Sequence, residues 1–222
     1  MSDALSQVSI VLPVGPGDRS WPPLYAALRE HATAAELLAV FADDDAQPAP
    51  DDALRAPKGR ALQQNAGAHA AQRPWLWFLH ADTRLTPETL PALRRFIERD
   101  ESALAWFRLR FDAEGSKTLQ WAMRANAMGA NWRSRRLGLP FGDQGLLMPR
   151  LEFDRLEGFD PHLAYGEDHA LVWHARRAGL PLRAIDAALV TSARKYVERG
   201  WLRTTLHHLR LTADQAWREM RR

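Results

Sequence analysis

Five consecutive apolar residues, Trp75 to Leu79, end abruptly at the polar sequence His80-Ala-Asp-Thr83. A short apolar run that stops in polar residues is typical of a strand buried on both faces of a parallel sheet. Open α/β sheets bind their ligands at the edge formed by the carboxyl ends of such strands. We therefore predict that His80 and Asp82 lie at this edge, where an imidazole and a carboxylate suit a divalent cation and a phosphate. The alternative is a helix N-cap, for which Asp and Thr are also good residues.

Strand and helix patterns alternate along the first half of the chain, which predicts an α/β fold with a mostly parallel central sheet flanked by helices. The expected strands are 8–14, 36–42 and 75–79, and the expected helices are 22–34, 58–72 and 87–99, with a proline-rich loop at 47–57. The second half predicts an exposed or antiparallel strand at 104–111, helices at 117–136 and 166–178, and a short strand at 145–148. No internal repeat or linker divides the chain, so we predict a single domain over residues 1–205.

Composition limits the kinds of metal site that the chain can form and indicates where in the cell it is expected. The chain has 222 residues and no cysteine, so disulfides and thiolate metal sites are excluded. No apolar run approaches the ~20 residues of a membrane span, and the first residues lack the basic start of a signal peptide, so we expect a cytoplasmic protein. Basic residues are dispersed and no nucleic-acid motif is present, so nucleic acid is not an expected partner.

The segment from Arg194 to Arg222 is locally basic, with eight Arg and Lys residues against three acids. Within it, residues 206–222 predict a helical tail that packs on the domain or extends from it. Such a tail can touch anionic lipid, which makes a peripheral contact with the inner face of a membrane a second expectation.

Four polar clusters could carry chemistry besides the one at Asp82. Asp43-Asp44-Asp45 follows the second predicted strand, and Lys58-Gly-Arg60 leads into a helix that carries Asn65. Residues 138–145 form a glycine-bounded loop with Asp143 and Gln144 at its tip, and Gly166-Glu-Asp-His169 opens a later helix. Cations at a helix start suit phosphate, and a carboxylate that faces a cleft is a candidate general base. Each cluster also has a simpler explanation, namely a solvated turn, a surface helix or a helix cap.

The order of these clusters resembles family 2 glycosyltransferases, which have a single-domain GT-A (Rossmann-like) fold. The resemblance extends over residues 7–205 and is carried by the segments 8–14, 57–67, 78–83, 142–145, 166–168 and 191–194. The sequence is most similar to a compact bacterial subgroup in which the family's Asp-x-Asp metal motif is written His-Ala-Asp-Thr.

The resemblance implies a metal-dependent inverting transfer of a sugar from a nucleoside diphosphate to an acceptor hydroxyl. Asp82 and His80 would bind Mg²⁺ or Mn²⁺ at the diphosphate of the donor. Asp168, preceded by Glu167, would remove the proton of the acceptor hydroxyl. The acceptor itself is not identified by the sequence.

The resemblance also implies which residues bind the nucleotide-sugar donor. Asp43 or Asp44 would contact the base or the ribose, and Lys58, Arg60 and Asn65 the same nucleotide. The remaining expected contacts are Asp143 and Gln144 around the donor sugar and the acceptor, and Arg194 and Lys195 near the diphosphate.

Two motifs depart from the family's pattern. The Asn-Glu expected after the first strand is replaced by Val-Gly-Pro-Gly-Asp18, and Asp43-Asp44-Asp45 lacks the glycine and serine that normally follow. These departures leave two alternatives open, a sugar nucleotidyltransferase and a degenerate non-catalytic protein that binds a nucleotide or a glycan.

Overall fold

The apolar run at Trp75 forms strand β4 (Trp75–Phe78), which lies inside an eight-stranded sheet. The computed structural model describes residues 3–112, 117–163 and 165–193. The other strands are β1 (Val8–Val14), β2 (Glu36–Ala42), β3 (Leu54–Ala56), β5 (Arg84–Leu85), β6 (Leu104–Asp112), β7 (Leu147–Pro149) and β8 (Leu182–Ser192). They are arranged in the order β3-β2-β1-β4-β7-β6-β8-β5. Pairing is parallel except where β7 joins β4 and β6 and where β5 joins β8.

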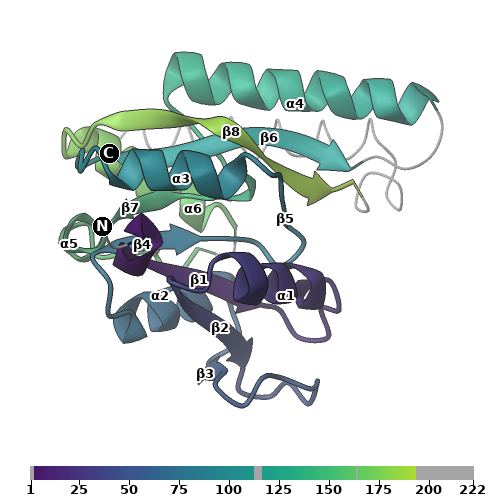
Figure 1. Cartoon of the computed structure of the whole chain (residues 1–222), viewed down its shortest axis with the longest axis vertical. Coiled ribbons are helices and arrows are strands. Elements are labelled where there is room, and N and C mark those ends of the chain that lie inside the picture. Colours follow the sequence, from purple (N-terminus) through teal and green to yellow (C-terminus); the bar gives the residue numbers. More distant parts are fainter. Residues whose placement is uncertain (1–2, 113–116, 164, 194–222) are drawn as a thin grey trace.

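Helices cover both faces of the sheet, as Figure 1 shows. The helices are α1 (Trp21–His31), α2 (Arg60–Ala70), α3 (Thr89–Ile97), α4 (Lys117–Leu137), α5 (Arg150–Arg155) and α6 (Glu167–Arg177), with short 3₁₀ turns η1 (Ala4–Gln7) and η2 (Gly142–Gln144). Helices α1 and α3 share one hydrophobic core with the sheet, and α2, α5 and α6 share the other. Helix α4 lies apart at one end of the molecule, with β3 at the opposite end.

Alternation along the strands explains why the sheet is buried on both sides. In β4, Trp75 and Trp77 belong to the core under α1 and α3, whereas Leu76 and Phe78 belong to the core under α2, α5 and α6. Because side chains point to opposite faces at successive positions, an unbroken apolar run fills both cores at once. The prediction of a doubly covered α/β sheet is therefore confirmed.

Most predicted elements occur within a few residues of their expected limits, but three strands and one α-helix were not predicted. The predicted loop 47–57 contains β3, and β5, α5 and the long strand β8 also went unrecognised. The strand predicted at 104–111 is β6, which pairs antiparallel with β7 and parallel with β8. Its second half exposes Arg108 and Arg110, in agreement with the alternation of its sequence.

Strand direction brings the polar clusters to one edge of the sheet. Strands β1, β2, β3 and β4 run parallel, and β6 and β8 run in the same direction because both neighbours of β7 are antiparallel to it. The residues after β2, β3, β4 and β8 therefore share an edge with the loop that precedes β7. This edge holds the candidate site.

Candidate active site at the carboxyl edge of the sheet

Asp168 is held in place by backbone hydrogen bonds at the start of α6. Its Oδ2 accepts a hydrogen bond from the Gly142 N–H at 2.5 Å, and its Oδ1 accepts one from the His169 N–H at 2.8 Å. The side chain is only half-buried. The carboxylate is thus fixed in orientation and is still open to a group that arrives from outside.

Glu167, the preceding residue, is in a different environment. Its side chain is 6% exposed, and its Oε1 lies 3.5 Å from Nη1 of Arg60. Burial and the neighbouring charge of Asp168 raise the pKa of the Glu167 carboxyl, against the opposing charges of Arg60 and His80. Glu167 therefore serves as the buried partner of Arg60, whereas Asp168 faces the open side of the site.

The raised pKa of Glu167 predicts a pH-dependent cost in stability. The folded state holds this proton more tightly than the unfolded state, so stability falls as pH rises from about 4.5, the usual glutamate value, through the folded pKa. The isosteric Glu167→Gln removes the cost. We expect its melting temperature to rise relative to that of the wild type between pH 5 and pH 8, and each kcal/mol of cost removed corresponds to about 2–4 °C.

The matched control for this experiment is Glu30→Gln, at an exposed position on α1. We expect this control to follow the wild type at both pH values. A Glu167→Gln variant whose melting temperature falls relative to the wild type as pH rises would contradict the prediction.

The side chains of His80 and Asp143 are in contact beside Asp168. The His80 Nδ1 lies 2.5 Å from Oδ1 of Asp143, and the His80 Nε2 is buried and has no hydrogen-bond partner among the described residues. A Cβ built on Gly142 would fall 2.5 Å from Oδ2 of Asp168 and 2.8 Å from the His80 Nε2. Only glycine therefore lets the loop before β7 pass between these two side chains.

Asp82 is an acidic residue beside a cavity of the site. No hydrogen bond or ion pair engages its side chain among the described residues, and it lines a cavity of about 240 Å³ together with Thr191 and Ser192 at the end of β8. Mg²⁺ is commonly held by one or two carboxylates plus the phosphates of a substrate. Asp82 fits this role, whereas the His80 Nδ1 is already turned to Asp143.

Within the described part of the chain, no group of three or more His, Cys, Asp and Glu side chains is placed to hold a metal. A preformed cage of protein ligands is thus not what this part of the chain offers. A cation at Asp82 would need oxygen ligands from the substrate to complete its shell.

Arg60 links the acidic residues of the site electrostatically. Partial desolvation opposes its charge, but Glu167, Asp168, Asp143 and Asp82 together outweigh this effect and raise the pKa of Arg60. Since its side chain is 48% exposed at the start of α2, Arg60 is also accessible to an incoming ligand. The four predicted acids and Arg60 thus act on one another at the same edge.

The acids and the lysine predicted to bind the base or ribose lie farther along this edge. Asp43 and Asp44 are exposed in the turn after β2, and Lys58 is exposed after β3. The neighbouring Asp45 accepts hydrogen bonds from the backbone of Gly17 and Gln47 and joins two loops of the edge. All three predicted contacts are therefore free to face a ligand.

Two predicted ligand contacts have structural partners instead. The Asn65 amide donates to the Phe159 carbonyl at 2.7 Å and accepts from the Phe159 N–H at 3.0 Å. Gln144 is fully buried, and its amide bonds the Phe107 carbonyl, the Ser134 hydroxyl and the Phe141 N–H. Both side-chain amides are engaged in hydrogen bonds within the protein, so we leave Asn65 and Gln144 out of the proposed site.

The predicted basic contacts Arg194 and Lys195, the tail 206–222 and the domain limit at residue 205 lie outside the described residues. The segment directly before them is described, and it ends beside Asp82 in the cavity lined by Thr191 and Ser192.

Arg133 was not predicted as a site residue. Its guanidinium lies 3.1 Å from the centre of the Phe141 ring, and its three side-chain nitrogens are buried with no hydrogen-bond partner in the part of the chain that the structure describes. Burial lowers the pKa of Arg133 to about 10, against the attraction of Asp168. The sequence did hold a signal, because Arg133 lies eleven residues after the buried Ala122 and so on the same face of α4.

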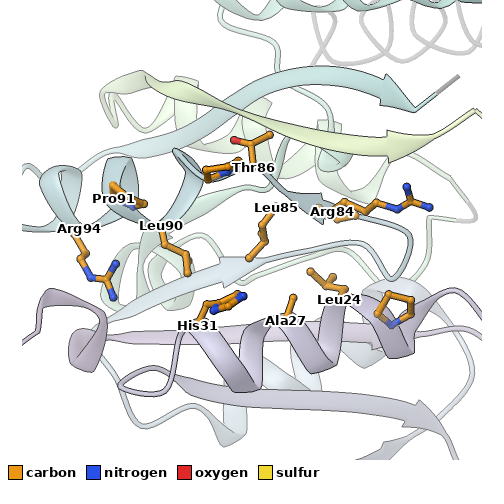
Figure 2. A pocket seen from close by; sticks show the side chains of 12 residues that line it. Leu24, Ala27, His31, Arg84, Leu85, Thr86, Leu90, Pro91 and Arg94 are labelled. Carbon is orange, nitrogen blue, oxygen red and sulfur yellow. The ribbon is translucent and has the colours of Figure 1, made fainter.

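A larger cavity of about 640 Å³ lies between α1, β5 and α3. Figure 2 shows Leu24 and Ala27 of α1 facing Leu85 and Leu90 across it. Its lining contains no carboxylate, and the ionisable side chains in it are His31, Arg84 and Arg94. The predicted metal residue Asp82 lines the smaller cavity instead.

Residues 53–154 match Glycosyl transferase family 2. The predicted resemblance to this family is thereby confirmed, and the matched segment contains Arg60, His80, Asp82, Arg133 and Asp143. No match was found among curated proteins.

Solved structures of TarS from S. aureus share the fold. TarS 1–349 is 13% identical with a TM-score of 0.62, and the alignment covers 85% of this chain and 61% of that one. TarS 1–349 in complex with UDP-GlcNAc is 13% identical with a TM-score of 0.63, covering 84% and 58%. The chain thus spans about three fifths of the length of these structural neighbours. The predicted GT-A-like fold is confirmed.

Proposed function

We propose that the chain is a metal-dependent inverting glycosyltransferase that moves a sugar from a nucleoside diphosphate to an acceptor hydroxyl. The observation that carries this proposal is the pair of carboxylates in separate environments at one edge. Asp82 lines a cavity and has no hydrogen-bond or ion-pair partner among the described residues, and Asp168 is oriented by two backbone N–H groups. A transfer reaction needs one group for the leaving diphosphate and another for the attacking hydroxyl.

Asp168 is the residue we assign to proton removal. It is half-buried and open to the site, whereas Glu167 is buried against Arg60. A base must lie within hydrogen-bond reach of the proton that it takes. When the acceptor hydroxyl is bound beside Asp168, attack on the face of the sugar opposite to the diphosphate inverts the anomeric centre.

Asp82 and the cations of the edge are assigned to the donor. A divalent ion at Asp82, Mg²⁺ or Mn²⁺, would supply Lewis-acid stabilisation of the departing diphosphate. Arg60 is placed to bind the same anion, with Lys58 and Asp43 or Asp44 toward the ribose and base. Arg194 and Lys195 complete the predicted set, and the cytoplasmic location and bacterial subgroup stay predictions from the sequence.

Binding of the donor is a direct test of this proposal. We expect one class of nucleotide sugar among UDP, GDP, CDP and dTDP donors to raise the melting temperature in the presence of Mn²⁺. UDP-GlcNAc is the first compound to test, because TarS was solved with it. A ligand at 100 times its Kd adds about 2.7 kcal/mol of stability, which corresponds to about 5–10 °C.

Asp82→Asn tests the assignment of the metal residue. We expect the Mn²⁺-dependent part of the shift to vanish in this variant and to persist in Asp154→Asn, a control on α5 whose acid makes only an exposed contact with Arg150. No shift with any donor would reject the donor site. A shift without turnover would favour the non-catalytic alternative, and a shift with nucleoside triphosphates alone would favour the nucleotidyltransferase.

A further inference from the structure

Helix α4 leaves most of its surface uncovered. Of its 21 residues, Ala122, Met123 and Ser134 are buried. The small cluster that Ala122 and Met123 form with Ala193 is separate from the two main cores. The helix runs along one outer end of the molecule, as Figure 1 shows. Its outward side is therefore a surface that the described part of the chain does not cover.

The exposed side of α4 carries an apolar stripe. Trp121, Met128 and Trp132 are 67%, 72% and 60% exposed. Their spacing of seven and four residues places them on one face of the helix. Large exposed apolar residues gathered in this way mark a binding surface, and tryptophan is favoured at the boundary between lipid and water.

Positive charge flanks this stripe and no acid offsets it within the helix. Residues 117–137 contain no Asp or Glu. Four cations of the helix are exposed, namely Lys117, Arg124, Arg135 and Arg136. Beyond the helix, Asp186 of β8 approaches Arg135 at 3.8 Å, and this exposed contact is worth little. The outer face of α4 is thus both apolar and strongly cationic.

This combination favours one occupant. A second copy of the chain would bring the same cations against these cations, which opposes self-association through α4. An anionic bilayer matches both features, because its headgroups attract the cations while its boundary accepts tryptophan. No helix among the described residues is long and apolar enough to cross a membrane, so the expected contact is with the surface of the bilayer.

We propose that the outer face of α4, made of Lys117, Trp121, Arg124, Met128, Trp132, Arg135 and Arg136, docks on an anionic lipid surface. The helix then lies parallel to the bilayer with the stripe at the headgroup boundary. This surface is distinct from the basic tail 206–222, to which the sequence alone assigned a membrane contact.

Vesicle co-sedimentation of the full chain tests this surface. We expect the protein to sediment with vesicles of phosphatidylcholine mixed with phosphatidylglycerol, to bind vesicles of phosphatidylcholine alone far more weakly, and to be released by salt. Each cation removed weakens binding about fivefold, so Arg124→Gln combined with Arg135→Gln is expected to reduce it more than tenfold. Trp121→Ser combined with Trp132→Ser is expected to reduce it at least as much.

The side chains replaced are exposed, so the variants are expected to keep the melting temperature of the wild type. The matched controls are Leu151→Ser, at a position 78% exposed on α5, and Arg29→Gln on α1, which should sediment like the wild type.

Three results would overturn the proposal. The first is a wild type that stays in the supernatant with the anionic vesicles. The second is binding that survives both α4 variants and is lost in Arg210→Gln combined with Arg218→Gln, because the tail would then be the contact. The third is an oligomer that the tryptophan variant dissociates, because a second copy would then occupy the stripe.

Discussion

Asp168→Asn is expected to lower the turnover rate by about 10²–10⁴, the usual contribution of a general base. Asparagine has the shape of aspartate, and its one acceptor oxygen can keep the hydrogen bond from the Gly142 N–H, whereas its NH2 group gives up the bond from the His169 N–H. It cannot take up a proton. The readout is release of nucleoside diphosphate from the donor that the melting experiment identifies, with water as the acceptor until a better one is known.

The neighbouring acid provides the control for this variant. Glu167→Gln removes the carboxyl next to Asp168 in the sequence, which is buried against Arg60. We expect this variant to lower the turnover rate by less than tenfold. Asp168→Asn should also keep the Mn²⁺-dependent melting shift, because the donor is assigned to Asp82. If Glu167→Gln loses the larger share of the rate, the two acids have been assigned the wrong way round.

The sheet could be predicted where strand and helix periods are strong. The run at Trp75 fills both cores and reads clearly as a buried strand, as do β1 and β2. Strand β8 was missed although Ile185, Ala187 and Leu189 alternate into one core, because its alanines blur the contrast on which the alternation depends. Short strands such as β3 are defined by their pairing with a neighbouring strand, and three residues are too few to show an alternating pattern in the sequence.

The edge of the sheet was predictable for the same reason, but the role of each side chain was not. Asp82 and Asp168 follow or open regular elements, so their location follows from topology. The amides of Asn65 and Gln144 find partners in Phe159 and Phe107, which are far away in the sequence. Such partners are settled by tertiary packing, and no local pattern indicates them.

Asn65 and Gln144 were predicted to bind a ligand but bond the protein, whereas Arg133 was not predicted and lies at the site. A cation on an arginine-rich helix reads as a solvated side chain, and most of the cations of α4 are solvated. The contact with the Phe141 ring and the attraction of Asp168 arise only when α4 meets the loop before β7. A position on the buried face of a helix is therefore a better guide to such a residue than its charge.

Gly142→Ala is expected to remove most of the activity through a single added methyl group. Gly142 is not among the glycines with positive φ, so alanine is allowed by the backbone and the effect is purely one of contact. The new Cβ would lie 2.5 Å from Oδ2 of Asp168 and 2.8 Å from the His80 Nε2, so these side chains or the loop must move. A displacement of about 1 Å in a catalytic group costs about 10²-fold in rate.

The energetic cost of this overpacking is about 1–3 kcal/mol, which a folded chain can tolerate. We therefore expect a lower melting temperature, a kcat reduced about 10²-fold and a retained donor-induced melting shift. Gly129→Ala is the matched control, since its Cβ meets nothing within 4 Å on α4 and a helical alanine adds about 0.5–1 kcal/mol of stability. Wild-type kcat in Gly142→Ala would show that Asp168 and His80 do not need their present positions. The close passage of the loop between them would then serve packing alone.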